Sequence, residues 1–341
     1  MRPMAEPLLR LDRLAKHFPV GGGWIDALAG KRSHVKAVDG VSLDVRQGET
    51  LAIVGESGSG KSTLGRLVMR LLTPSAGQVL YKGRNVVAMN RAELRQFRRQ
   101  AQIIFQDPFS SLNPRMRIAD IVREPLDVYQ DGARADRPDR TEALLERVGL
   151  TAAHGRAYPS ELSGGQRQRV GIAAALALSP DLIVADEPTS ALDVSVQAQT
   201  LNLLADLQAS YHLTFVFITH DLGIVHHFAD RVAVMYLGRI VEEAPTETLF
   251  REPKHPYTRS LLSAIPQPDP TKRVDWQLPE GEPPSPVDPP SGCSFHPRCP
   301  HTMDVCARQA PALAPIEPGH RAACFLHQPA ADSAPQTGMQ S

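Results

Sequence analysis

The 341-residue sequence predicts an α/β fold in which helices cover a mostly parallel sheet. Short apolar runs such as "TLAIV" (50–54), "LIVAD" (182–186) and "LTFVFITH" (213–220) alternate with helical segments, as buried parallel strands do. A glycine-rich turn joins the first run to a helical pattern. Because the chain exceeds the usual size of one domain, we expect a large domain with an appendage, or two domains.

The first 54 residues predict short strands separated by turns. The strand patterns are "LLRLDRL" (8–14), "VKAV" (35–38) and "VSLDV" (41–45). Asp39-Gly40 lies between two of them, and an Asp-Gly pair between apolar residues indicates a hairpin turn. Gln47-Gly48 marks the next turn before the buried run 50–54. Apolar spacing then predicts a helix from Lys61 to Leu72.

The middle of the chain predicts mostly helices. Residues 91–100 have the Glu/Arg spacing of a solvated helix face. Residues 107–160 form a helical insertion, interrupted by the polar loop "DGARADRPDR" (131–140). A long helix is expected from Ser163 to about Ser179, where Pro180-Asp181 ends it.

Composition changes after Ala264, since fourteen of the 30 prolines lie between Pro266 and Pro318. Proline excludes most helices and central strands there. We expect a linker over 266–292, a small cysteine-bearing module over 293–327 and a disordered tail over 328–341.

Charge and hydropathy limit the possible partners. Lys plus Arg and Asp plus Glu both total 37, which argues weakly against nucleic acid or anionic lipid as the partner. Apolar runs such as "GIAAALAL" (171–178) are too short to cross a bilayer, and the charged N-terminus does not resemble a signal peptide. We therefore expect a soluble, cytoplasmic protein.

The segment "GESGSGKS" (55–62) fits the pattern G-x-x-x-x-G-K-[ST] between a predicted strand and a predicted helix. In such a P-loop, backbone N–H groups turn toward phosphate oxygens. Lys61 would place a positive charge near the β- and γ-phosphates, and the Ser62 hydroxyl would bind Mg²⁺. The segment "SGGQ" (163–166) opens a second predicted helix, which is also a possible anion site.

Polar residues that suit ATP hydrolysis follow three other apolar runs. Asp186 ends "LIVAD" and would reach Mg²⁺ through water, and Glu187 would polarise the attacking water as a general base. His220 ends the next run and would hydrogen-bond the γ-phosphate. Gln106 would join the magnesium shell.

With these motifs in order, residues 8–265 resemble an ABC-transporter ATPase subunit. The resemblance is carried by "GESGSGKST" (55–63), Gln106, "LSGGQ" (162–166), "LIVADE" (182–187), "SALD" (190–193) and His220. It implies a P-loop NTPase fold of the ABC cassette type over 1–265: a RecA-like parallel-sheet core, an antiparallel β subdomain and a helical subdomain at about 107–170. It also implies ATP hydrolysis coupled to transport.

The resemblance assigns roles by position. It implies that two cassettes pack head to tail over two ATP molecules, so that each "LSGGQ" turn contacts the γ-phosphate held by its partner. Lys61, Glu187 and His220 would be catalytic, and Ser62, Gln106 and Asp186 would hold Mg²⁺ with ATP. The other contacts within the subunit would be Phe18, Gly55, Glu56, Ser57, Gly58, Ser59, Gly60 and Thr63; those in trans would be Ser163, Gly164, Gly165, Gln166 and Asp193. Phe18 would stack on adenine, with a core phenylalanine as the alternative.

Finer matches are similar to the oligopeptide/dipeptide importer branch, and to the second of its two unlike ATPase subunits. They are "HVKAVDGVSL" (34–43), "FQDPFSSLNPRM" (105–116), "YPSELSGGQRQR" (158–169) and "HPYTRSLLSAIP" (255–266), together with the long stretch between Phe18 and Val35. The implied partners are a second ATPase subunit, two membrane permeases and an extracytoplasmic solute-binding protein, which would place the chain peripherally on the cytoplasmic face of the inner membrane. Nickel and glutathione are alternative cargoes. A soluble ABC ATPase acting on nucleic acid or ribosomes, and a catalytically inactive cassette, are less favoured.

Cys293, Cys299, Cys306 and Cys324 are all the cysteines of the chain. Disulfides are disfavoured in a cytosolic protein, and four thiolates suit Zn²⁺ or an iron–sulfur cluster. Reduced, unliganded thiols are the third possibility. The resemblance implies a [4Fe–4S] cluster, and a metal would also explain how a small Pro-rich module folds.

Overall fold

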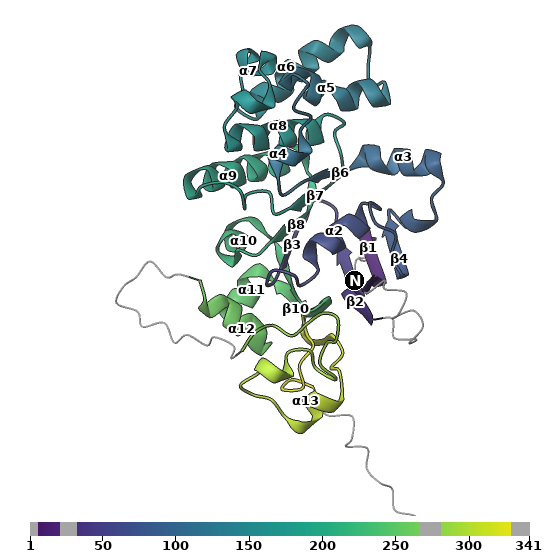
Figure 1. Cartoon of the computed structure of the whole chain (residues 1–341), viewed down its shortest axis with the longest axis vertical. Helices are drawn as coiled ribbons and strands as arrows, with labels where there is room; N and C mark the ends of the chain where they lie inside the picture. Colours follow the sequence, from purple (N-terminus) through teal and green to yellow (C-terminus); the bar gives the residue numbers. More distant parts are fainter. Residues whose placement is uncertain (1–5, 21–32, 266–280, 329–341) are drawn as a thin grey trace, which may run out of the picture.

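The computed structural model describes residues 6–20, 33–265 and 281–328. The described residues form two sheets (Figure 1). The first is antiparallel, with the strand order β2-β1-β4-β5, and the second has the order β11-β12-β10-β9-β3-β8-β7-β6. The strands are β1 (Leu9–Val20), β2 (Ser33–Val45), β3 (Thr50–Val54), β4 (Ala76–Tyr81), β5 (Arg84–Asn85), β6 (Ala101–Ile104), β7 (Leu182–Asp186), β8 (Thr214–Thr219), β9 (Arg231–Tyr236), β10 (Arg239–Pro245), β11 (Ala314–Glu317) and β12 (His320–Ala322).

The centre of the second sheet is parallel, as the apolar runs predict. Strands β9, β3, β8, β7 and β6 pair in parallel. Every residue of β3, β7 and β8 is buried, because helices or the first sheet cover both faces. Their carboxyl ends meet at one edge, where the polar residues that follow them gather. The α/β fold with an antiparallel β subdomain is confirmed.

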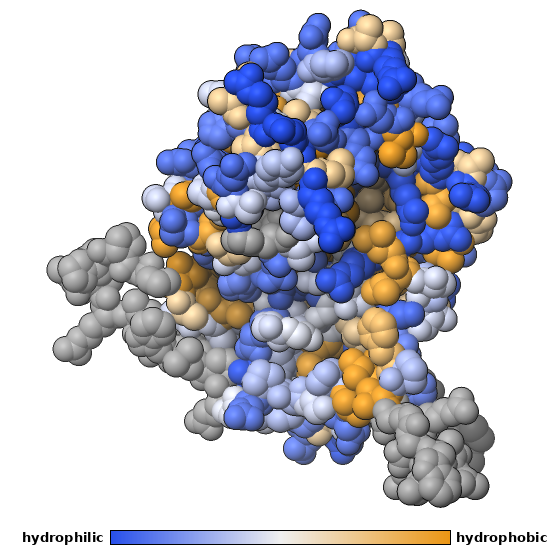
Figure 2. Space-filling model, turned by 45° about the horizontal axis from the view of Figure 1, so that its top comes forward, coloured by the Kyte–Doolittle hydropathy of each residue, from blue (hydrophilic) through white to orange (hydrophobic). Residues whose placement is uncertain are grey.

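Helices surround this sheet and extend away from it at one end of the molecule (Figure 1). No helix in the described parts of the chain is long and apolar enough to span a bilayer, and the face drawn in Figure 2 is largely hydrophilic. The helices are α2 (Lys61–Val68), α3 (Arg91–Gln100), α4 (Pro108–Ser111), α5 (Ile118–Tyr129), α6 (Arg137–Arg147), α7 (Ala152–Arg156), α8 (Gly164–Leu176), α9 (Val194–Tyr211), α10 (Leu222–Phe228), α11 (Thr246–Arg251), α12 (Pro256–Ser263) and α13 (Asp304–Arg308).

Two helices end earlier than the sequence predicts. Helix α2 ends at Val68 rather than Leu72, since Arg70 adopts a left-handed φ of 47°. Helix α8 ends at Leu176 rather than Ser179, where φ is 50°. The predicted polar loop 131–140 is also shorter, because α6 begins at Arg137.

The hairpin predicted at Asp39-Gly40 is wrong. Strand β2 continues through this pair, and residues on both sides of it pair with β1: Val41 lies opposite Leu14 and Val38 opposite Lys16. Gly40 has a φ of 75°. Its left-handed conformation accompanies an irregularity in the pairing of β2 with β1 and does not reverse the chain.

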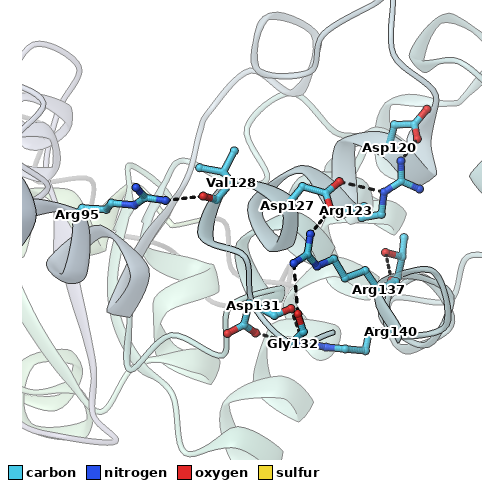
Figure 3. Close-up of polar contacts among 10 residues, drawn as sticks. Arg95, Asp120, Arg123, Asp127, Val128, Asp131, Gly132, Arg137 and Arg140 are labelled. Atoms are coloured by element: carbon cyan, nitrogen blue, oxygen red, sulfur yellow. Dashed lines mark hydrogen bonds and ion pairs between the residues drawn. The ribbon is translucent and has the colours of Figure 1, made fainter. Parts of the chain in front are cut away.

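The helical subdomain is held together by an arginine–aspartate network (Figure 3). Asp127 of α5 accepts hydrogen bonds from Arg123 at 3.1 Å and from Arg137 of α6 at 2.8 Å. Arg95 of α3 donates to the carbonyl oxygen of Val128. The solvated face predicted for 91–100 thus also braces the helical subdomain against the core.

The segment after residue 280 packs on the sheet. Strand β12 pairs with β10, and β11, which contains Pro315, forms the sheet edge, where proline is tolerated. Phe295 is 1% exposed and belongs to the apolar cluster around β9 and α12. The module therefore shares the core of the cassette. Most of the predicted linker (266–280) and tail (329–341) lies outside the described residues, and the other domain boundaries stay predictions.

Candidate active site

The P-loop (residues 55–63) connects β3 to α2, and two of its glycines are required by their surroundings. Gly60 precedes α2 with a φ of 105°, and a Cβ there would lie 2.0 Å from the carbonyl oxygen of Ala37. Gly55 has a φ of 154°, and its Cβ would lie 2.1 Å from the carbonyl oxygen of Met235. Only glycine allows this winding, which presents the N-terminus of α2 to an anion.

Lys61 is the buried cation of the loop. Its ammonium group donates to the carbonyl oxygens of Gly55 and Glu56, each at 2.8 Å, and the residue is only 4% exposed. Burial lowers the pKa of Lys61, while the carboxylates of Glu187, Asp186 and Glu56 oppose that shift. A desolvated cation held beside the loop attracts phosphate more strongly than a surface lysine does.

Ser62 and Asp186 meet as the sequence predicts. The Ser62 hydroxyl donates to Asp186 Oδ1 at 2.7 Å. Burial raises the pKa of Asp186, against the effect of this hydrogen bond, so a nearby cation would favour its charged form. A hydroxyl and a carboxylate are oxygen ligands of the kind that Mg²⁺ takes beside substrate phosphates. This donor pair fits a magnesium–nucleotide site.

Glu187 lies at the tip of β7 between Gln106 and His220. The Gln106 amide donates to Glu187 Oε2 at 2.9 Å, and His220 Nδ1 lies 3.4 Å from Glu187 Oε1. Glu187 itself has a left-handed φ of 46°, a costly conformation for a non-glycine residue that is common at functional sites. Two residues predicted from separate segments, Gln106 and His220, therefore converge on the carboxylate of Glu187.

With the exception of Asp186, these groups line one open cavity of about 660 Å³. Sequence reasoning missed four apolar residues of its wall: Val35, Ala37, Leu261 and Pro286. Their apolar side chains give no local signal of a nucleotide site, because β2, α12 and the C-terminal segment meet the P-loop only after folding. The predicted residues that line the cavity are Gly55, Glu56, Ser57, Gly58, Gly60, Lys61, Ser62, Thr63, Gln106, Glu187 and His220.

Phe18 and Ser59 do not line this cavity. Phe18 pairs with Val35 across β1 and β2, and the Lys16 ammonium group lies 5.1 Å from its ring. Its strand partner Val35 is a wall residue, so Phe18 lies one strand away from the cavity. Ser59 is buried, 3.4 Å from Lys61 Nζ.

The signature turn (residues 162–166) begins a helix away from this cavity. Ser163 caps α8: its hydroxyl accepts from the Gln166 N–H at 3.3 Å, and the Gln166 side chain accepts from the Ser163 N–H at 2.9 Å. Gly164, Gly165 and the nearby Asp193 do not line the cavity either. This turn is therefore not part of the wall of its own subunit's cavity, and the contacts in trans stay a prediction.

The four cysteines converge although they are far apart in sequence. All four line one small pocket in the C-terminal module, together with His255, His296 and His301. Burial raises the pKa of the Cys324 thiol to about 11 and also raises that of Cys293 and Cys299. Within residues 6–20, 33–265 and 281–328, however, no group of three His, Cys, Asp or Glu side chains is placed to hold a metal ion.

The fold and the cavity define a P-loop ATPase of the ABC cassette class. Residues 38–190 match the family model "ABC transporter" and residues 241–306 match "Oligopeptide/dipeptide transporter, C-terminal region". The "Probable peptide ABC transporter ATP-binding protein y4tS" of Sinorhizobium fredii is 51% identical over 329 residues, covering 96% of this chain and 92% of its own length. The "Oligopeptide transport ATP-binding protein AppF" of Bacillus subtilis is 47% identical over 326 residues, covering 94% and 98%.

Solved structures agree with this assignment. The dimeric cassette MJ0796, in a post-hydrolysis state with ADP and Pi, has a TM-score of 0.61 and 30% identity, covering 70% of this chain and 98% of its own. The structure of cbiO1 of Clostridium perfringens, part of the ABC transporter complex cbiONQ, has a TM-score of 0.62 and 28% identity, covering 72% of this chain and 92% of its own. The chain belongs to the family of ABC-transporter ATP-binding proteins, in its oligopeptide/dipeptide branch.

Proposed function

We propose that the chain hydrolyses ATP to energise the uptake of di- or oligopeptides through a membrane ABC importer. The match of residues 241–306 to the C-terminal region of oligopeptide/dipeptide transporters carries the cargo assignment, and relatives named as peptide import proteins support it. Uptake of labelled peptides into vesicles by the purified transporter tests it. Uptake of nickel or glutathione, with none of peptide, would overturn the cargo.

Hydrolysis is assigned to the groups around Glu187. Glu187 accepts a proton from the attacking water as a general base, and Gln106 orients its carboxylate through the 2.9 Å hydrogen bond. Lys61 neutralises phosphate charge, and His220 donates to the γ-phosphate. Mg²⁺, when bound with ATP by Ser62, Asp186 and Gln106, neutralises charge on the β- and γ-phosphates.

Two cassettes are needed to complete each site. The capped N-terminus of α8 offers N–H groups to an anion, yet it lies away from the cavity of its own subunit. We assign Ser163, Gly164, Gly165, Gln166 and Asp193 to the partner's nucleotide. ATP then joins the two cassettes, and loss of the γ-phosphate separates them.

The assembly comprises a second ATPase subunit, identical or different, two permeases and an indirectly contacted solute-binding protein. The chain would lie peripherally on the cytoplasmic face of the inner membrane. No nucleic acid partner is expected. Co-purification with two permeases supports this assembly, whereas a stable soluble complex with nucleic acid or ribosomes would contradict it.

For the cysteines we propose a [4Fe–4S] cluster, with Zn²⁺ as the alternative. The donor set fits, because four thiols share one pocket, while their placement in the structure does not provide a formed metal site. The test is iron and sulfide content of anaerobically purified protein, with absorption near 400 nm that Cys299→Ser removes. Colourless wild-type protein free of iron and zinc would leave the thiols unliganded.

A further inference from the structure

The second residue of the P-loop, Glu56, is held at three points. Its N–H donates to the Tyr257 hydroxyl at 2.8 Å, and its carbonyl oxygen accepts from Lys61 Nζ at 2.8 Å. Its carboxylate accepts from Arg298 Nη1, at 3.1 Å to one oxygen and 3.3 Å to the other. Tyr257 and Arg298 lie in "HPYT" and "HPRC", two segments that the ATPase chemistry described above does not use.

Arg298 belongs to the cysteine module and directly precedes Cys299. Its side chain is 8% exposed, and Nη1 also lies 3.4 Å from the Tyr236 hydroxyl. Phe295, one turn earlier, packs its ring 5.4 Å from the rings of both Tyr236 and Tyr257. A buried aromatic cluster thus fixes the position from which Arg298 reaches the P-loop.

The negative charge of Glu56 opposes the binding of a negatively charged triphosphate to this loop. Glu56 lines the cavity that would hold a triphosphate, and a carboxylate repels phosphate more strongly where solvent is partly excluded than it does in water. The guanidinium of Arg298 neutralises the carboxylate through charge-assisted hydrogen bonds. It also keeps the carboxylate on the side of the module.

We infer that Arg298 is a positioning residue for ATP binding, through which the cysteine module sets the ATP affinity of this subunit. The inference rests on the proposed ATP site. Arg298 acts by neutralising the charge of Glu56 and fixing its backbone, without contacting the nucleotide. Loss of the arginine should weaken ATP binding only as long as position 56 is acidic.

The experiment measures Mg-ATP affinity and steady-state hydrolysis with the full-length subunit in its complex. Arg298→Gln should raise Kd and KM about tenfold, because the carboxylate of Glu56 is then no longer neutralised and repels the phosphates, with kcat nearly unchanged. In about 0.5 M salt the difference in Kd between Arg298→Gln and wild type should become smaller, because screening weakens the repulsion between Glu56 and the phosphates. Arg298→Lys should restore most of the affinity.

A second substitution distinguishes charge from folding. Glu56→Gln in the Arg298→Gln background should return Kd to within about threefold of wild type, because the amide carries no charge that repels the phosphates. Arg308→Gln changes an exposed arginine of the same module and should leave Kd unchanged. Thermal melting checks that each variant is folded.

The outcomes separate this inference from the proposed function. If Arg298→Gln binds ATP like wild type, or if Glu56→Gln fails to rescue it while both proteins are folded, the role of Arg298 is wrong and the ATP site stands. If wild type and Arg308→Gln bind no ATP, the proposed function is wrong and the inference falls with it.

Discussion

Replacing Gly164 with alanine should separate the function of the signature turn from its fold. Gly164 is the first residue of α8, and an added Cβ would meet nothing closer than Leu192 Cδ2 at 3.7 Å, an ordinary contact. Alanine also favours helix over glycine by up to about 1 kcal/mol. The subunit should therefore be as stable as wild type, or slightly more stable.

The interface should respond differently. If the Gly164 N–H contacts the partner's γ-phosphate, a methyl group inserted there displaces a hydrogen bond to a charged group, worth about 1.5–3 kcal/mol. We expect ATPase activity and ATP-driven dimerisation to fall roughly 10- to 150-fold, since each 1.4 kcal/mol is a factor of ten.

The assay compares phosphate release and ATP-dependent dimerisation, by light scattering, with the melting temperature of the unassembled subunit. Gly171→Ala is the matched control, because it lies in the same helix with nothing within 4 Å of its added Cβ. It should gain stability and keep full activity. Gly165→Ala is unsuitable, since its Cβ would lie 2.4 Å from Val196 Cγ1. Activity of Gly164→Ala within twofold of wild type, or a loss that tracks a fall in melting temperature, would refute the contact in trans.

Four other substitutions test the cassette. Glu187→Gln should bind ATP but lower turnover about 10²- to 10⁴-fold in phosphate-release assays, because the amide cannot accept a proton; near-normal turnover would remove Glu187 from this role. Gly60→Ala should abolish ATP binding in calorimetry, since its Cβ would lie 2.0 Å from a carbonyl oxygen; normal affinity would contradict the loop geometry. His320→Ala should cost about 2–3 kcal/mol of unfolding free energy, because it removes a 2.7 Å partner of the buried Glu242 carboxylate; a change below 0.5 kcal/mol would refute this. Burial raises the pKa of Glu242, but hydrogen bonds from His320, Thr258 and two backbone N–H groups outweigh this effect and hold the pKa below its usual value. The charged carboxylate should therefore stabilise the fold above pH ~4.3, and this stabilisation should fade as the pH falls through the lowered pKa. Glu242→Gln should lack this pH-dependent stabilisation in acid-unfolding curves.

Much of the central sheet and of its polar edge could be predicted from the sequence. Strands β3, β7 and β8 are buried on both faces, and such strands consist of continuous apolar runs that are easily recognised in a sequence. Residues at or just after the ends of these strands, such as Asp186 and Glu187, lie at one edge of the sheet. The prediction of a hairpin at Asp39-Gly40 was wrong because turn preference depends only on local sequence, whereas both halves of β2 pair with β1. Nothing local could reveal Arg298, which contacts Glu56 across 242 residues.

The C-terminal module is best understood as part of the cassette. Its β12 extends the central sheet through β10, and His320 of β12 forms a buried hydrogen bond with Glu242 of β10 at 2.7 Å. Pro-rich segments bury little apolar surface of their own, and here Phe295 fills a core that β9 and α12 have already built. Because the same segment supplies Arg298 to the P-loop, we expect a change that loosens the module to disturb the contact between Arg298 and Glu56 and, through it, the nucleotide site.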